Sequence, residues 1–170
     1  MNFLGRHFFK WLWKLVVVIL LLAAARSSLA DWNEVPSRSM MPTILPGDRI
    51  YVNKLAYGLR VPFSRWWIAR WGEPGRGDVV TLLSPRDGTL LVKRIAAVPG
   101  DLIEGVGQRV PPDKYFVTGD NRDHSVDSRS FGMVDRAMIL GRVGGIIFSL
   151  DPERTFHPRR GRTLTGLRSS

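Results

Sequence analysis

The stretch "LLVKRIAAVPGDLIEGV", residues 90–106, alternates in character over its first half and then meets a Pro-Gly pair. Successive side chains of a β-strand point to opposite faces. The face that carries Lys93 would then also carry Leu91, Ile95 and Ala97. The other face would carry Val92, Arg94 and Ala96. The pattern therefore predicts a strand that places a lysine on an apolar face.

The turn signal in this stretch recurs along the chain. Gly-Asp pairs stand at 47–48, 77–78, 100–101 and 119–120, and the first three precede the strand-like runs "RIYV", "VVTLL" and "LIEGV". Proline precedes glycine at 46–47 and 99–100, which supplies the fixed φ and the positive φ that a type II turn requires. We expect these turns to join short strands.

Further β-rich runs are "YFVT" at 115–118 and "AMILGRVGGIIFSL" at 137–150, and no long helical period follows residue 30. Many short strands between Gly and Pro turns are typical of an all-β sandwich or barrel. We therefore predict a mostly β, compact antiparallel barrel or sandwich over residues 31–170. Its last part, 151–170, is rich in Arg, Gly and Ser and is expected to form an extended tail.

The composition of the chain excludes several kinds of functional site. The 170 residues suit one domain with an appendage, and there is no cysteine, which excludes disulfides, thiolate nucleophiles and zinc held by sulfur. Three histidines, at 7, 124 and 157, are too scattered to suggest a metal site. The 25 basic residues exceed the 15 acidic ones, but much of the excess lies at the two ends. A membrane surface explains that distribution as well as nucleic acid does.

The N-terminal block "FFKWLWKLVVVILLLAAA", residues 8–25, is apolar apart from two lysines. A span needs about 20 apolar residues, and lysines near one end can reach the headgroups. Trp11 and Trp13 suit the interface, and basic residues before the block favour a cytoplasmic N-terminus. We expect residues 1–30 to form that terminus and one transmembrane helix over about 9–26. The alternative is a cleavable signal peptide ending at Ser28-Leu29-Ala30. In both cases the rest of the chain is exported.

A second unusual segment is "VPFSRWWIARWG", residues 61–72, which mixes three tryptophans with arginines. Tryptophan and arginine together suit a surface that rests on a bilayer interface. A loop or short helix that covers the core is an equally good interpretation, and the sequence leaves both open.

Several residue sets could carry chemistry. A Ser-His-Asp triad would depend on His124, which lies in a polar turn with nothing to bury it. Asp120, Asp123 and Asp127 do not have EF-hand spacing, and the arginines among them would repel a cation. Lys93 has two possible outcomes: it extends to water, or it is desolvated and its pKa falls. A neutral lysine is a general base that can take a proton from a serine.

Four blocks follow one another along the chain: "PSRSMMPTILPGDRIYVNKLAYG" (36–58), "RGDVV" (76–80), "KRIAAVPGD" (93–101) and "GDNRDHSVDSRSFGMV" (119–134). In this order they resemble the type I signal peptidases, a family of membrane-anchored Ser-Lys proteases. The pieces "GRVGGIIFSLD" and "TGLR" resemble the closing strand and tail of the family. The resemblance covers nearly the whole exported part of the chain and implies a β-rich peptidase domain.

The resemblance implies a role for each matching residue. Ser39 would be the nucleophile and Lys93 its general base, while Ser37 and the backbone N–H of Ser39 would bind the oxyanion. Ser125 would orient the Lys93 amine. The residues expected to support this loop are Asp127, Arg129, Asp120 and Asn121, and those expected to line a shallow substrate groove are Met40, Ile50 and Val92. No metal or cofactor is implied.

The implied substrates are preproteins, cut after small residues of the Ala-x-Ala type on the exported side of the plasma membrane. The implied partners are these preproteins and membrane lipid, with no nucleic acid and no obligate protein partner. Arg38 stands where the family usually has a small residue, and Ala97 stands where it has a glycine. Only 17 residues, 102–118, separate the third block from the fourth, too few for the extra domain of larger members.

Three alternatives remain. A dedicated processing peptidase, for example for a conjugative pilin precursor, would use the same chemistry on one substrate. Self-cleaving repressor proteases share the Ser-Lys logic but need a DNA-binding domain in place of the apolar block. A non-catalytic, membrane-tethered basic module would bind anionic lipid or nucleic acid, but it would be free to lose Ser39 or Lys93.

Overall fold

A computed structural model describes residues 10–20, 23, 30–61, 64, 66–103, 105, 107–151, 157–162 and 165–167. Residues 10–20 are helical. Within the described ranges, no helix combines the length and the apolar character needed to cross a membrane. Residues 9, 21, 22 and 24–26 of the predicted span lie outside those ranges.

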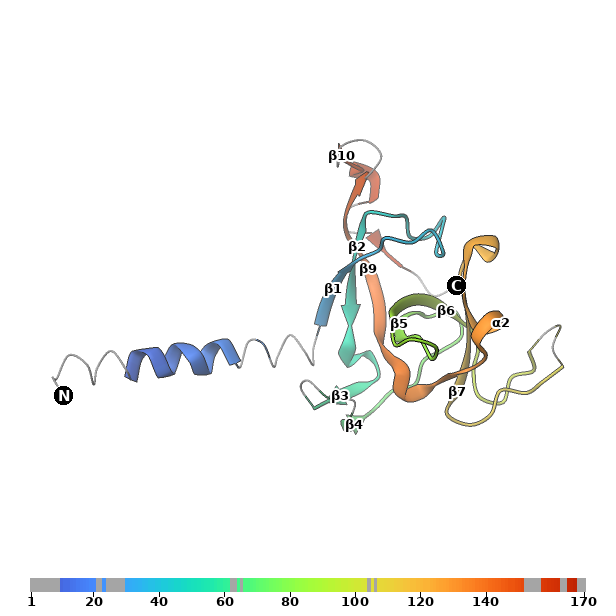
Figure 1. The fold of residues 1–170 in the computed structure, drawn as a ribbon, viewed down its shortest axis with the longest axis horizontal. Coiled ribbons are helices and arrows are strands. Elements are labelled where there is room, and N and C mark those ends of the chain that lie inside the picture. The colour runs from blue at the N-terminus through green and yellow to red at the C-terminus, as the bar shows by residue number, and fades with distance from the viewer. Residues whose placement is uncertain are drawn as a thin grey trace.

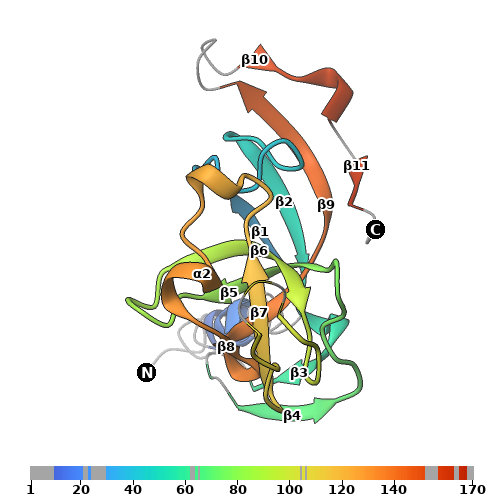
Figure 2. The same cartoon turned by 90° about the vertical axis from the view of Figure 1, so that its right-hand side faces the viewer.

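The domain is built on one antiparallel sheet (Figures 1 and 2). Its strands are β1 (Ala30–Glu34), β2 (Asp48–Asn53), β5 (Val79–Leu83), β6 (Leu90–Ala97), β7 (Lys114–Thr118), β8 (Val134–Asp135) and β9 (Ile139–Asp151). They are hydrogen-bonded in the order β1-β2-β9-β5-β6-β7-β8. After residue 30, the helical pieces in the described residues are α2 (Ser128–Phe131) and the short 3-10 helices Lys54–Ala56, Arg122–His124, Arg136–Met138 and Arg160–Arg162.

The mostly β prediction is confirmed, but the described strands form a curled sheet rather than a closed barrel or a two-sheet sandwich. β5 and β6 are strongly curved in Figure 1. Because the sheet curls, both faces of β5 are covered: Val79 packs in the cluster with Met40 and Ile50, and Val80 packs in the cluster with Tyr115 and Val117. This continuous burial explains why "VVTLL" lacks polar alternation.

Three of the four Gly-Asp pairs close the same kind of turn. In the turn Leu45–Asp48, the Asp48 N–H donates to the Leu45 carbonyl at 3.0 Å, and the Leu45 N–H donates to the Asp48 carboxylate at 2.8 Å. The turns 75–78 and 98–101 repeat both bonds. Gly47 and Gly100 have φ of 85° and 89°, as the predicted type II turns require. The motif therefore starts β2 and β5 at fixed points.

Two expectations differ from the structure. The run "LIEGV" is no strand in its described residues, where Leu102 forms only an isolated bridge with Arg109. Residues 151–170 were expected to form an extended tail, but their described parts lie on the domain. β10 (His157–Pro158) and β11 (Thr165–Gly166) both pair with β9. Distant pairing of this kind has no signal in a local Arg-rich composition.

The tryptophan-rich segment forms a separate hairpin of β3 (Gly58–Arg60) and β4 (Trp67–Arg70), seen at the lower left of the domain in Figure 1. Trp67 packs against the hydrophobic core, whereas Trp66 is 79% exposed. The core-covering interpretation therefore describes Trp67 only. The bilayer interpretation stays a prediction for the exposed side chains.

Candidate active site

The turn that follows β1 carries Ser39 and is held by the loop that follows β7. Asn121 donates its backbone N–H to the Ser39 carbonyl at 3.0 Å and its side-chain N–H to the Arg38 carbonyl at 3.1 Å. Within the turn, the Ile44 N–H donates to the Met40 carbonyl at 2.9 Å. The backbone around Ser39 is thus fixed from both sides, and the Arg38 side chain is left exposed.

Lys93 reaches the same turn from β6. Its Nζ donates to the Ser39 Oγ at 2.8 Å, and both side chains are buried, with Lys93 only 2% exposed. The predicted alternation is confirmed, since Ile95 and Ala97 are buried beside it. Burial lowers the pKa of Lys93, and the negative charge of Asp127 opposes that shift only in part. Of the two possibilities for Lys93, the structure shows a desolvated side chain rather than one that extends to water.

Ser37 lies two residues before Ser39 on the same turn. Its Oγ is 3.2 Å from the Ser39 Oγ, and either hydroxyl can be the donor. Ser37 is exposed, whereas Ser39 is buried. A hydroxyl in this position can donate to an atom that approaches Ser39 from outside.

Asp127 organises the loop that faces Ser39. Its carboxylate is fully buried and accepts hydrogen bonds from Gly119 N at 2.9 Å and from Arg129 Nε at 2.9 Å. It also caps α2 by accepting from the Arg129 N–H. Burial opposes ionisation, but the hydrogen bonds from Arg129 and Gly119 outweigh it and hold the pKa of Asp127 well below its usual range.

Asp120 anchors the other side of this loop to the sheet. It accepts from Arg94 Nε at 2.8 Å and from Arg94 Nη2 at 2.7 Å, and Arg94 also donates to the Gly77 carbonyl. Burial again opposes ionisation, but hydrogen bonds from Arg94 and Thr43 lower the pKa of Asp120. Since Arg94 follows Lys93 on β6, this pair joins the Lys93 strand to the loop that holds Ser39.

Ser125 is close to the pair but does not touch the Lys93 amine through a hydrogen bond within the described residues. Its Oγ is buried and lacks a well-formed hydrogen bond there. A Cβ at Gly119 would lie 2.3 Å from this Oγ and 2.5 Å from the Ser39 carbonyl oxygen, so the contact requires glycine. The role of Ser125 in orienting Lys93 stays a prediction.

The residues predicted to line the groove occupy different depths. Met40 and Ile50 are fully buried in one core cluster, and Val92 packs against that cluster while partly exposed. The structure therefore places Met40 and Ile50 in the core rather than on an open surface. They pack there with Val35, Ile44 and Val52. A shallow substrate groove at this point would therefore need exposed side chains of neighbouring residues in its floor.

A second support of the nucleophile turn, formed by Arg159 and Arg162, was not predicted from the sequence. Arg162 donates to the Asp48 carboxylate at 2.7 Å and to the Thr43 carbonyl at 2.8 Å. Arg159 donates to the Pro46 carbonyl at 3.0 Å and lies 4.0 Å from the other Asp48 oxygen. Asp48 itself is fully buried. The end of the chain thus clamps the segment that follows Ser39.

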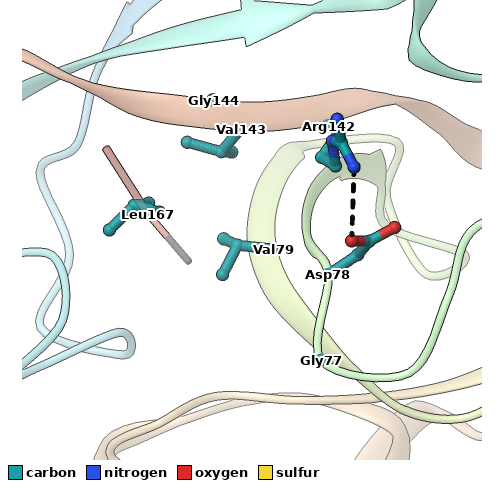
Figure 3. A pocket seen from close by; sticks show the side chains of 7 residues that line it. All are labelled: Gly77, Asp78, Val79, Arg142, Val143, Gly144 and Leu167. Carbon is teal, nitrogen blue, oxygen red and sulfur yellow. Dashed lines mark ion pairs between the residues drawn. The ribbon is translucent and has the colours of Figure 1, made fainter. Parts of the chain in front are cut away.

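A cavity of about 290 Å³ lies between β5, β9 and β11 (Figure 3). Asp78 and Arg142 face each other at 3.8 Å on one side, and three apolar side chains fill the other: Val79, Val143 and Leu167. None of the lining residues belongs to the set around Ser39. The cavity is therefore separate from the Ser39–Lys93 pair.

A buried lysine amine bonded to a serine hydroxyl is a variant of the hydroxyl-plus-base arrangement of serine hydrolases. His124, the only histidine near this loop in sequence, is exposed. The site therefore has the features of a Ser-Lys hydrolase rather than of a Ser-His-Asp one.

Comparison with known proteins agrees with this class. The family profile described as "Signal peptidase, peptidase S26" matches residues 8–109 and 104–148. The chain therefore belongs to the signal peptidase family, peptidase S26.

Among its relatives, signal peptidase I of Pseudomonas aeruginosa is 28% identical, covering 85% of this chain and 74% of that protein. A probable signal peptidase I-2 of Synechocystis is 30% identical, covering 75% and 67%. Signal peptidase I P of Bacillus subtilis subsp. natto is 28% identical, covering 83% and 89%. A crystal structure of a signal peptidase I from Enterococcus faecalis V583 is 26% identical over 42% of this chain and 97% of that chain, with a TM-score of 0.36.

Proposed function

We propose that this protein is a serine endopeptidase that cleaves signal peptides from preproteins, with Ser39 as nucleophile and Lys93 as general base. The observation that carries the proposal is the 2.8 Å hydrogen bond between the two buried side chains, in a chain of the signal peptidase family. A base works only within hydrogen-bond reach of the proton it takes, and this distance meets that requirement.

In the first half of the reaction, the neutral Lys93 amine takes the Ser39 proton as the Ser39 oxygen attacks the carbonyl carbon of the scissile bond. The protonated amine then gives the proton to the leaving amine, and an acyl-enzyme ester remains on Ser39. In the second half, Lys93 takes a proton from water as the water oxygen attacks the ester carbonyl. The protonated amine then gives this proton to the Ser39 oxygen as the ester C–O bond breaks, which releases the signal peptide and restores the neutral amine. Burial supports this cycle, because it lowers the pKa of Lys93, so the amine stays neutral at a lower pH than an exposed lysine would.

The negative charge on the carbonyl oxygen needs donors. The Ser39 backbone N–H and the Ser37 hydroxyl are the donors we propose, since Ser37 Oγ already lies 3.2 Å from the attacking atom. One donor of this kind typically contributes about 3 kcal/mol to transition-state stabilisation. The hydrogen bonds from Asn121 to the Arg38 and Ser39 carbonyls support this role, because they hold the backbone of the turn in place.

The substrate would bind as an extended chain beside β1. β1 ends the sheet order and runs directly into the turn with Ser37 and Ser39, so an added strand would reach the nucleophile. Met40, which follows Ser39 in the chain, is fully buried in the core, and this packing favours a shallow site that accepts small side chains such as Ala before the cut. We further propose that the apolar block 8–25 anchors the protein in the plasma membrane with the sheet domain on the exported side.

The test is cleavage of a preprotein with an Ala-x-Ala site by the detergent-solubilised full chain. Ser39→Ala is expected to abolish cleavage and leave the unfolding temperature close to that of the wild type. Ser130→Ala is the matched control, because Ser130 is exposed and lies outside the site. Wild-type cleavage by Ser39→Ala would overturn the assignment of the nucleophile. A survey of released peptides would separate a general enzyme from one dedicated to a single substrate.

A further inference from the structure

A groove runs along the outer face of β7. Two cavities of about 440 and 600 Å³ adjoin one another there, since Ile103, Phe116 and Arg129 line both of them. Thr118 lines the first cavity and Lys114 the second, so together they follow β7 over its whole length, about 13 Å at 3.3 Å per residue. In Figure 2, β7 lies at the front of the domain with α2 beside it. We call these two cavities the basic groove.

The lining of the basic groove is positively charged. Its described residues include no carboxylate and four cations, which are Arg76, Arg122, Arg129 and Lys114. Three of the four pair at 2.6–2.8 Å with carboxylates that do not line the groove: Arg76 with Asp101, Arg129 with Asp127 and Lys114 with Asp135. The Arg122 guanidinium makes no ion pair within the described part of the chain. Glu104, on the loop that carries Ile103, lies outside the described residues. A cleft lined by one sign of charge attracts ligands of the opposite sign, so the lining indicates an anionic occupant.

The floor of the groove indicates a peptide rather than a small anion. Ala96 and Phe116 are half-buried there, and Phe116 packs against the buried Ile103. Gln108 and Thr118 add uncharged polar groups. A free phosphate would use the guanidinium groups but not an apolar floor of this length. An extended acidic peptide uses both, because its backbone lies on the floor while its carboxylates bind the arginine forks.

One end of the groove meets the loop that holds the nucleophile turn. Asn121 donates to the Ser39 and Arg38 carbonyls at 3.0 and 3.1 Å, and Arg122, which lines the groove, is the next residue. Consecutive Cα atoms are 3.8 Å apart, so Arg122 lies on the order of 10 Å from Ser39. An extended chain advances about 3.3 Å per residue and would reach Arg122 about three residues beyond Ser39.

The sheet order indicates which half of a substrate faces the groove. The half before the cut is proposed above to lie beside β1, which leads into the Ser39 turn. β7 is separated from β1 in the sheet by β2, β9, β5 and β6, and the Ser39 turn joins the two sides through Asn121. A chain that lies extended across Ser39 with one half beside β1 therefore directs its other half toward β7. That other half is the start of the mature protein.

We propose that the basic groove binds the first residues of the mature protein and selects preproteins with acidic residues at positions two to five after the cut. The proposal deepens the proposed function and rests on it, because it assigns a substrate class to the same site. Arg122 is the main contact, and Arg76 and Arg129 contribute the guanidinium donors that their own pairs leave over. Acidic residues at these positions speed the encounter with the enzyme and hold the scissile bond at Ser39.

Three synthetic peptides test the proposal. They share one Ala-x-Ala sequence before the cut and carry at positions two to five after it either Asp and Glu, the amides Asn and Gln, or lysine. The detergent-solubilised full chain should cleave the acidic peptide with about tenfold higher kcat/KM than the amide peptide at low salt, since one exposed ion pair contributes roughly twofold to fivefold. At about 1 M salt the screening length falls to about 3 Å, and the preference should disappear. Equal kcat/KM on the acidic and amide peptides at low salt, or a preference for lysine, would overturn the proposal.

Variants of Arg122 locate the source of the preference. Arg122→Gln should lower the ratio of acidic to amide kcat/KM to about threefold, because one ion pair is lost, and Arg122→Glu should favour the lysine peptide. The fold should persist in both, since Arg122 is exposed and holds Arg129 through its backbone carbonyl. Arg86→Gln is the matched control: Arg86 is exposed on the turn between β5 and β6 and does not line the groove. It should keep the tenfold ratio. A wild-type ratio in Arg122→Glu would show that the groove is not the source.

Binding without cleavage separates this proposal from the proposed function. The full chain with Ser39→Ala is titrated with fluorescent peptides that carry only the mature half. The acidic peptide should bind about tenfold more tightly than the amide peptide at low salt, and adding Arg122→Gln should remove most of the difference. If the wild type cleaved no peptide while this difference was present, the proposed function alone would be contradicted. If the peptides were cleaved but neither rate nor binding depended on their charge, the role of the groove alone would be contradicted.

Discussion

The clamp between Asp48 and Arg162 offers a quantitative test of how the nucleophile turn is held. Arg162→Gln removes the 2.7 Å bond to Asp48 and the 2.8 Å bond to the Thr43 carbonyl. Asp48 would then be a fully buried carboxylate with the Leu45 N–H at 2.8 Å and Arg159 at 4.0 Å from its other oxygen. The buried charge is left only partly compensated.

The expected cost follows from that geometry. Removing one partner of a buried ion pair typically costs about 3–5 kcal/mol, because the other charge stays buried. Arg162 is 27% exposed in its side chain and Arg159 remains nearby, so we expect a smaller cost, about 2–3 kcal/mol. For a domain of this size that is roughly 4–12 °C in Tm. The turn would also lose its tie at Thr43, so kcat should fall about tenfold while KM changes little.

The assay is urea unfolding together with kcat and KM on a soluble peptide. Arg49→Gln is the control, since Arg49 and Glu34 form an exposed pair at 3.4 Å that should contribute less than about 1 kcal/mol. Arg162→Lys restores the charge and should recover part of both stability and kcat. If Arg162→Gln unfolded and cleaved like Arg49→Gln, the clamp would have no role in holding the turn.

Three further predictions concern the site itself. Gly119→Ala should abolish cleavage, because the added Cβ would lie 2.3 Å from the Ser125 Oγ and 2.5 Å from the Ser39 carbonyl oxygen. Gly161→Ala is the control and should keep wild-type kcat/KM, because a Cβ there would meet no atom within 4 Å. Activity should fall as pH drops and Lys93 is protonated, with a midpoint below the usual lysine value of about 10.4, because burial lowers its pKa; a rate that stays flat to acidic pH would contradict a lysine base. Ser128→Ala removes the hydroxyl that accepts a buried β7 N–H at 2.9 Å and should cost about 1–3 kcal/mol in urea unfolding, whereas an unchanged midpoint would show that water replaces the bond.

Local patterns in the sequence placed several strands of the large sheet, β2, β5, β6, β7 and β9. Alternation on β6 put Lys93 on the buried face, and the Pro-Gly-Asp turns fixed the starts of β2 and the end of β6. Each of these signals depends on neighbours a few residues apart. The run "LIEGV" shows the limit, since its glycine, Gly105, adopts a positive φ and no partner strand faces its described residues.

Contacts between residues far apart in the chain could not be predicted from these local patterns. Arg162 and Asp48 are 114 positions apart, and their bond depends on how β10 and β11 return along β9. The stack of Arg136 on Trp67 likewise depends on the hairpin folding back onto the core. The resemblance to a family indicated which residues to compare, but only the fold brings these distant charges together.

The central claim is that Lys93 acts as a neutral base on Ser39, and Lys93→Arg tests it most directly. Arginine keeps the positive charge and the hydrogen-bond donors but does not lose its proton at any pH at which the protein is folded. Measured as kcat/KM on a preprotein with an Ala-x-Ala site, Lys93→Arg should be inactive from pH 6 to 10, while Lys114→Arg, on an exposed ion pair with Asp135, should match the wild type. Substantial cleavage by a folded Lys93→Arg would contradict the claim.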